Sequence, residues 1–125
     1  MALIVQKFGG SSVADAEKIR NVARIITDEY QKGNRVVAVL SAQGDTTDDL
    51  IEKAAEINPN ASKRELDMLL STGEQISCSL CAMAIEGMGF PVVSLTGWQA
   101  GFRTNSGYGN ARMRSACTRL IRALP

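Results

Sequence analysis

The sequence contains no histidine and only three cysteines, Cys78, Cys81 and Cys117, so side chains that commonly bind zinc are scarce. Cys78 and Cys81 have the spacing of a redox or zinc-ligand pair, but no second pair of ligands accompanies them. They also fall in an apolar segment of helical character, residues 75–83. We therefore interpret them as buried structural thiols.

Neither sign of charge is in excess, because 14 lysine and arginine residues balance 13 aspartate and glutamate residues. The net charge of +1 argues against a protein dedicated to nucleic acid or to a membrane surface. No apolar run approaches the roughly 20 residues that span a bilayer, and the amino terminus lacks the layout of a signal peptide. We therefore expect a cytoplasmic protein without nucleic-acid or membrane partners.

Internal repeats and domain linkers are absent from the 125 residues, of which 45% are hydrophobic and 22% charged. This balance is typical of one globular core. Apolar runs at 3–7, 35–41 and 91–96 alternate with segments of helical period, which predicts an α/β fold with a parallel sheet. Because these runs lack polar alternation, we expect both faces of the sheet to be covered.

The segments between the predicted strands have the period of helices. The first helix should begin with Ser12 as its N-cap, because Asp15 follows three residues later in a variant of the capping box. We predict further helices over 47–57, 63–70 and 73–86. The Gly-rich residues 98–109 indicate a long loop or short irregular strands over a site. In the tail from 110 to 124, the apolar residues form one stripe.

The segment 7–12, Lys-Phe-Gly-Gly-Ser-Ser, follows the first predicted strand and has the composition of a phosphate site. Glycines let the backbone approach an anion, and the following helix supplies N–H groups and the positive end of its dipole. Lys7 adds a mobile positive charge. An ordinary strand-to-helix turn has a similar composition, so both interpretations stay open at this point.

Two further segments place polar groups near the predicted ends of strands and helices. Ser41 ends the second predicted strand and Thr47 follows it, where open parallel sheets bind ligands. Alternatively, Thr46 or Thr47 only caps the next helix. Glu74, between two apolar helical stretches, is either an acid at a helix start or the partner of a ligand cation.

Four segments, in this order, resemble the aspartate kinases (aspartokinases), a family of the amino acid kinase superfamily. They are residues 5–13 (VQKFGGSSV), 40–50 (LSAQGDTTDDL), 63–75 (KRELDMLLSTGEQ) and 94–101 (SLTGWQAG). The resemblance runs from residue 2 to about residue 112. Within the motifs the departures are small, since Ser11 stands where the family usually has Thr and Gln43 where Met is usual.

The resemblance implies an αβα three-layer sandwich of the amino acid kinase (carbamate kinase-like) fold, with residues 1–125 as the amino-terminal part of the domain. Family members continue into a nucleotide-binding half and regulatory ACT domains, so we expect a fragment that is inactive alone. The implied parent reaction transfers the γ-phosphoryl group of MgATP to the side-chain carboxylate of L-aspartate. The product, 4-phospho-L-aspartate, begins lysine, threonine and methionine biosynthesis.

The resemblance also implies roles for individual residues. Lys7 would be the catalytic cation that stabilises the transferring phosphoryl group. The ATP and phosphate contacts would be Lys7, Phe8, Gly9, Gly10, Ser11 and Ser41. Thr47 and Glu74 would bind aspartate, with Glu74 pairing with the α-ammonium group. Since a carboxylate is already an ionised nucleophile at neutral pH, the reaction needs no general base, and no metal ligand is expected besides the Mg²⁺ that ATP brings.

Two alternatives stay open. N-acetylglutamate, glutamate and nucleoside monophosphate kinases share the fold, but an acylated substrate has no ammonium group for Glu74 to meet. The chain could instead be a non-catalytic, truncated interaction module that forms a homo-oligomer. Its amphipathic tail from Met113 to Leu124 could then pack against a second copy, because an exposed sheet edge invites pairing.

Overall fold

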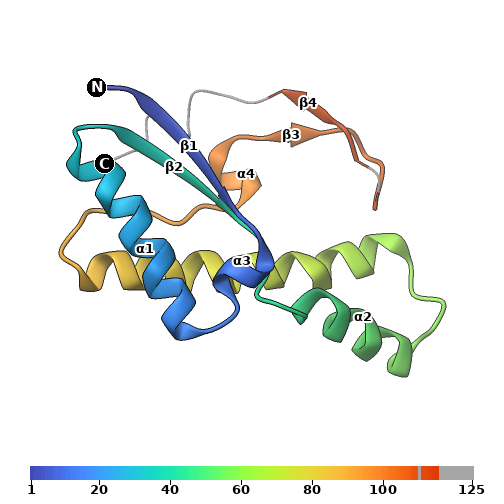
Figure 1. The fold of residues 1–125 in the computed structure, drawn as a ribbon. Coiled ribbons are helices and arrows are strands. Elements are labelled where there is room, and N and C mark those ends of the chain that lie inside the picture. The colour runs from blue at the N-terminus through green and yellow to red at the C-terminus, as the bar shows by residue number, and fades with distance from the viewer. Residues whose placement is uncertain (110, 116–125) are drawn as a thin grey trace.

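This computed structural model describes residues 1–109 and 111–115 (Figure 1). The elements in chain order are β1 (Leu3–Phe8), η1 (Gly10–Val13), α1 (Ala16–Gln31), β2 (Arg35–Leu40), α2 (Thr46–Ile57), α3 (Lys63–Gly87), α4 (Gly97–Ala100), β3 (Arg103–Thr104) and β4 (Met113–Ser115). The first two strands and the helix that follows the second strand agree with the predicted ranges to within one residue.

β1 and β2 form a parallel pair, in register from Leu3 opposite Arg35 to Phe8 opposite Leu40. This confirms the prediction of parallel strands joined by a helix. Side chains alternate across the pleat. On β1 the even-numbered residues 4, 6 and 8 face inward, and the odd-numbered residues 3, 5 and 7 are exposed.

The core lies between the inward face of this sheet and the helices α1 and α3, which cross beneath it in Figure 1. Its buried members are Val13, Ile19, Val22, Ala23, Ile26, Cys81 and Ile85. Partly buried side chains from both strands, including Phe8 and Leu40, pack against this cluster. Burial of these apolar side chains is the main source of the fold's stability.

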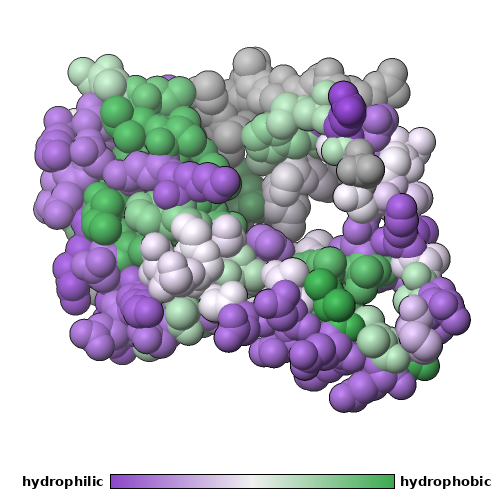
Figure 2. Space-filling model, turned by 45° about the vertical axis from the view of Figure 1, so that its right-hand side comes forward, coloured by the Kyte–Doolittle hydropathy of each residue, from purple (hydrophilic) through white to green (hydrophobic). Residues whose placement is uncertain are grey.

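Among the described residues, side chains on the outward face of the sheet stay exposed, which corrects the expectation that both faces are covered. Val5 is 64% exposed, and Leu3 and Val39 beside it are also exposed. Figure 2, which is turned by 45° from the view of Figure 1, shows hydrophobic surface at the upper left of the molecule. The β-branched composition correctly predicted strands. It could not predict how many helical layers cover them, because that depends on which elements pack on each face.

Residues 91–96 were expected to be a third strand, and this prediction is wrong within the described part of the chain. β1 and β2 form a two-stranded sheet, and residues 91–96 belong to neither of the described sheets. Phe90 anchors the start of this segment by an edge-to-face ring contact with Tyr30. A valine-rich run favours extended backbone, but a strand also needs a neighbour with which to exchange hydrogen bonds.

The start of the first helix also differs from the prediction. Its N-cap is Asp15, whose side chain accepts a hydrogen bond from the N–H of Lys18 at 2.9 Å. Ser12 lies instead inside the 3-10 helix η1, where its N–H donates to the carbonyl of Gly9. Val13 follows it and is fully buried, so this extra turn delivers an apolar side chain to the core before α1 begins.

The two helices predicted over 63–70 and 73–86 are one continuous helix, α3. The hydroxyls of Ser71 and Thr72 donate to the carbonyls of Met68 and Leu69, so these polar residues are accommodated within the helix. By length and composition α3 could cross a membrane, contrary to the expected absence of such a run. Its buried Gly73, Ser77, Cys81, Ala82 and Ile85 give it the packed face of a core helix.

The segment after residue 96 contains short elements, as expected for the Gly-rich region. Thr96 and Gln99 form a capping box at the start of α4, and Gly101 ends this helix with φ at 90°. β3 and β4 pair antiparallel. Met113 lies in β4, and the rest of the apolar stripe predicted in the tail, with Cys117, lies outside the described residues.

Candidate active site

Three segments meet at the carboxyl ends of β1 and β2: the turn after β1, the turn after β2 and the middle of α3 (Figure 1). The N–H of Gly44 donates to the carbonyl of Gly10 at 2.9 Å, which joins the turn after β2 to the turn after β1. The side-chain amide of Gln43 donates to the carbonyl of Val13, also at 2.9 Å. The glycine turn and the hydroxyl-rich turn predicted from the sequence are therefore neighbours.

The two glycines after β1 differ in their surroundings. A Cβ on Gly10 would lie 2.8 Å from the carbonyl oxygen of Ala42, so any side chain there would collide with the neighbouring turn. A Cβ on Gly9 would meet nothing within 4 Å. Within the described chain, no side chain caps the amino end of η1. The backbone at Gly9 is thus open to an approaching group, while Gly10 allows close packing.

The remaining residues of the first motif are divided between the two faces of the sheet. Phe8 is half-buried against the core. Lys7 belongs to the exposed set on β1 and leaves the sheet on the face opposite α1, while Ser11 is exposed in η1. Lys7 is therefore adjacent to the glycine turn in sequence, but it does not point toward the start of α1.

Ser41 directly follows β2, and its backbone forms hydrogen bonds with two other segments. Its N–H donates to the carbonyl of Phe8 at 3.1 Å, which continues the strand pairing by one residue. Its carbonyl accepts a hydrogen bond from the hydroxyl of Ser77 at 2.6 Å. Ser77 lies on α3 and is 0% exposed, so this bond fixes the middle of α3 to the end of β2.

Close packing also joins α3 to the start of α2. A Cβ on Gly73 would lie 2.9 Å from the Cβ of Ala42 and 3.6 Å from a methyl group of Thr46. Thr47, the predicted aspartate contact, is half-buried in the first turn of α2. The N-cap of α2 is Asp45, so the alternative in which Thr46 or Thr47 caps this helix is wrong.

Glu74 is exposed in the middle of α3, so the alternative of an acid at a helix start is wrong. It lines a groove of ≈ 840 Å³ whose lining includes residues of β1, β2, α1 and α3 and of the segment 90–102. Thr96, Gly97 and Gln99 line the same groove. The third and fourth motifs of the sequence therefore face a common space, whereas Lys7, Gly9, Ser11 and Thr47 lie outside its lining.

The cysteines of α3 fit the prediction of structural thiols. Cys81 is buried, and this burial raises the pKa of its thiol to about 11. Burial also raises the pKa of the half-buried Cys78. Both thiols are free, and the described residues contain no cluster of three metal-binding side chains. The prediction for Cys117 falls outside the described residues.

Sequence reasoning missed Ser77 and the contact made by Gln43. Ser77 lies three residues after Glu74 on a helix, a spacing that places the two side chains on neighbouring parts of its surface. This spacing was visible in the sequence. The carbonyl that receives the Ser77 hydroxyl was not, because it belongs to a residue 36 positions away.

A parallel α/β unit with an open glycine turn after one strand and a hydroxyl-bearing turn after the next is the kind of scaffold that binds phosphate groups. The sequence profile of the amino acid kinase family matches residues 2–124. The chain therefore belongs to the amino acid kinase family.

Several individual relatives are aspartate kinases. The chain is 54% identical over 122 residues to the aspartokinase of Geobacillus stearothermophilus, and 52% identical over 121 residues to aspartokinase 2 of Bacillus subtilis. These alignments cover 98% and 97% of the chain and 30% of each relative. The chain thus spans about 30% of the length of the curated relatives it matches.

The crystal structure of aspartate kinase from Synechocystis resembles the fold with a TM-score of 0.76 and 52% sequence identity. The match covers 79% of this chain and 17% of that chain. The predicted resemblance and the amino acid kinase fold are both confirmed.

Proposed function

We propose that residues 1–125 form the amino-terminal part of the catalytic domain of a cytoplasmic aspartate kinase. The parent reaction transfers the γ-phosphoryl group of MgATP to the side-chain carboxylate of L-aspartate. This step commits aspartate to lysine, threonine and methionine synthesis. The proposal rests on the similarity to aspartokinases and on one observation: α3 carries Glu74 and is bonded to the end of β2, where Ser41 lies beside the glycine turn.

In this proposal the phosphate groups meet the backbone at Gly9, Gly10 and Ser11, with Ser41 as a further contact. Lys7 approaches the transferring group from the outward face of the sheet on its flexible four-carbon stem. Its positive charge stabilises the negative charge that spreads over the phosphoryl oxygens in the transition state. Mg²⁺ arrives with ATP, and it neutralises phosphate charge when bound.

Glu74 supplies the charge complement for the amino acid. Its side chain lines the groove, where the carboxylate can pair with the α-ammonium group of L-aspartate. Thr47 adds a hydroxyl from the start of α2. The substrate carboxylate attacks without a base, since it is ionised at neutral pH, so catalysis consists of positioning and charge stabilisation.

The test uses a chimeric enzyme in which this chain replaces the matching segment of the Geobacillus stearothermophilus aspartokinase. We expect aspartate-dependent turnover of ATP by the chimera and none by residues 1–125 alone. Glu74→Gln should lower kcat/KM for aspartate by roughly 10- to 100-fold, because it removes a charge-assisted contact of about 1.5–3 kcal/mol. The KM for ATP should barely change. Unchanged aspartate kinetics with a raised KM for ATP would overturn the assignment of Glu74.

A second candidate is an interaction module that pairs with another copy of itself. The open sheet face at Leu3, Val5 and Val39 favours it, because exposed apolar strands tend to associate. Light scattering coupled to gel filtration measures the mass of the chain in solution. A dimer that Val5→Lys converts to a monomer would support this candidate, and a monomeric unmutated chain would exclude it.

A further inference from the structure

Ser77 is the most completely buried polar side chain near the candidate site. It is 0% exposed and sits on the inner face of α3, between Gly73 and Cys81. A buried hydroxyl is costly unless it is hydrogen-bonded, and an alanine would fill a helix position without this requirement. The bond that Ser77 makes therefore gives the best indication of its role.

The hydroxyl of Ser77 lies between the backbones of two candidate site residues. Its Oγ is 2.6 Å from the carbonyl oxygen of Ser41 and 3.1 Å from the carbonyl oxygen of Glu74. A hydroxyl has one proton, so it donates to the nearer oxygen, that of Ser41. One side chain thus connects the residue proposed to contact phosphate with the residue proposed to contact the substrate ammonium group.

We propose that Ser77 is a positioning residue that sets the distance between the phosphate side and the aspartate side of the active site. The inference rests on the proposed function of Ser41 and Glu74. Ser77 touches neither substrate, because it is enclosed beneath both residues. It acts by holding the turn of α3 that bears Glu74 against the last residue of the β2 ladder.

This role predicts a particular kinetic effect. Phosphoryl transfer requires the attacking carboxylate and the phosphoryl group to be held in line and close together, and a displacement near 1 Å can cost about 100-fold in rate. Without the Ser77 bond, each substrate still finds its own contacts. Only the distance between the phosphate side and the aspartate side is no longer fixed, so kcat should fall while each KM changes little.

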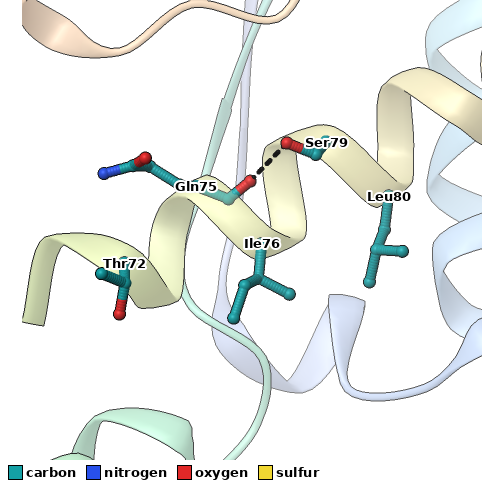
Figure 3. Close-up of a pocket in the computed structure, with 5 residues that line it drawn as sticks. All are labelled: Thr72, Gln75, Ile76, Ser79 and Leu80. Atoms are coloured by element: carbon teal, nitrogen blue, oxygen red, sulfur yellow. Dashed lines mark hydrogen bonds between the residues drawn. The ribbon is translucent and has the colours of Figure 1, made fainter.

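The experiment compares Ser77→Ala with two control variants in the chimeric aspartokinase. In Ser79→Ala the lost hydroxyl bonds within α3 alone, to the carbonyl of Gln75 at 2.8 Å (Figure 3). In Thr27→Ala the lost hydroxyl is also buried, but it bonds within α1 to the carbonyl of Arg24. Both controls remove a helix hydroxyl without releasing α3 from β2, and Thr27→Ala removes a buried methyl group as well.

We expect Ser77→Ala to lower kcat by about 10- to 100-fold with both KM values within about threefold of the unmutated enzyme. The controls should keep kcat within about twofold, even if the loss of a buried hydroxyl lowers the unfolding midpoint of Thr27→Ala. Because Ser77→Ala leaves a small void, Ser77→Cys is measured in parallel. Its sulfur fills the site but donates weakly and at greater length, so it should show the same kinetic pattern with a smaller amplitude.

The possible outcomes distinguish a failure of the inference from a failure of the proposed function. If kcat for Ser77→Ala and Ser77→Cys equals that of the controls, or if both KM values rise while kcat stays constant, Ser77 is structural and the inference fails. If the unmutated chimera does not turn over ATP with aspartate, the proposed function fails, and the inference fails with it. An active chimera with an insensitive Ser77 leaves the proposed function standing, so the two failures are distinguishable.

Discussion

The candidate site has a packed side and an open side, and the two sides are built from different kinds of residue. The packed side consists of Gly10, Gly73 and Ser77. A Cβ on either glycine would lie within 3 Å of a neighbouring atom, and the hydroxyl of Ser77 lies 2.6 Å from the carbonyl oxygen of Ser41. The open side consists of Lys7, Gly9 and Glu74, all of which are exposed. The packed side contains no ionisable group, and the open side bears both charges.

The packed side therefore sets the geometry of the site, and the open side carries the groups that can meet a ligand. Glycine and serine on the packed side allow the turns after β1 and β2 to approach α3 closely, which determines where the open side lies. The charged residues of the open side make no contribution to the core, so they are free to meet a ligand. Substitutions on the packed side should therefore destabilise the fold or change the spacing of the site, and substitutions on the open side should not destabilise the fold.

The largest effect should come from Lys7 on the open side. In the chimeric aspartokinase, Lys7→Met should lower kcat by about 100-fold or more, the usual result of removing one group that stabilises transition-state charge. The KM for aspartate should change much less, because the charge acts mainly as the transition state forms. Steady-state kinetics with each substrate varied measure both constants. Thermal unfolding should match that of the unmutated enzyme, and a lowered midpoint would place Lys7 on the packed side.

The adjacent glycines should respond in opposite ways. In the 125-residue chain, Gly10→Ala should lower the free energy of unfolding by about 1–3 kcal/mol, the typical cost of overpacking, because the new Cβ meets a backbone oxygen 2.8 Å away. Gly9→Ala should be neutral or stabilise by up to about 1 kcal/mol, since its backbone is extended and its surroundings are empty. Urea unfolding of both variants is the measurement. Equal destabilisation would remove the distinction between the two sides at this turn.

Cys81 lies one helical turn beyond Ser77 and tests the burial of the same face of α3. Burial raises the pKa of its thiol to about 11 in the folded chain, from an ordinary value of 9.0. Between these values the unfolded state has lost the proton that the folded state keeps, so stability is intact below about pH 9 and falls as the pH rises toward 11.

We expect the chain to lose up to about 2 kcal/mol of stability from this group between about pH 9 and 11. Urea unfolding at several pH values gives the slope, and Cys81→Ala should flatten it relative to the unmutated chain. Lysine and tyrosine titrations are common to both proteins, so the difference between the two slopes isolates the thiol. Parallel slopes would show that Cys81 is accessible to water in the folded state.

The open side was largely predictable from the sequence, and the packed side was not. Lys7, Gly9 and Glu74 belong to local motifs whose residue types already suggest phosphate or ammonium partners. The sequence predicts Gly73 at the start of a separate helix over 73–86. Its actual role depends on the Cβ of Ala42, a contact between residues distant in sequence.

The third predicted strand is wrong for a related reason. The composition of residues 91–96 describes a preference for extended backbone, but a strand is defined by hydrogen bonds to a neighbour that composition does not specify. The same limit applies to the open sheet face around Val5. Local propensity correctly predicted the first two strands, and the packing partners had to come from the structure.

A small effect should come from Gly73, because two contributions oppose each other there. Gly73→Ala gains about 1 kcal/mol of helix propensity in the middle of α3 and loses about 1–3 kcal/mol to overpacking against Ala42, 2.9 Å away. We expect a net destabilisation of about 0–2 kcal/mol in urea unfolding. The double variant Gly73→Ala with Ala42→Gly removes the colliding methyl group and should recover most of this loss. If the double variant is as unstable as the sum of the two single variants, Gly73 and Ala42 do not share this contact, and the close approach of α3 to the turn after β2 has another cause.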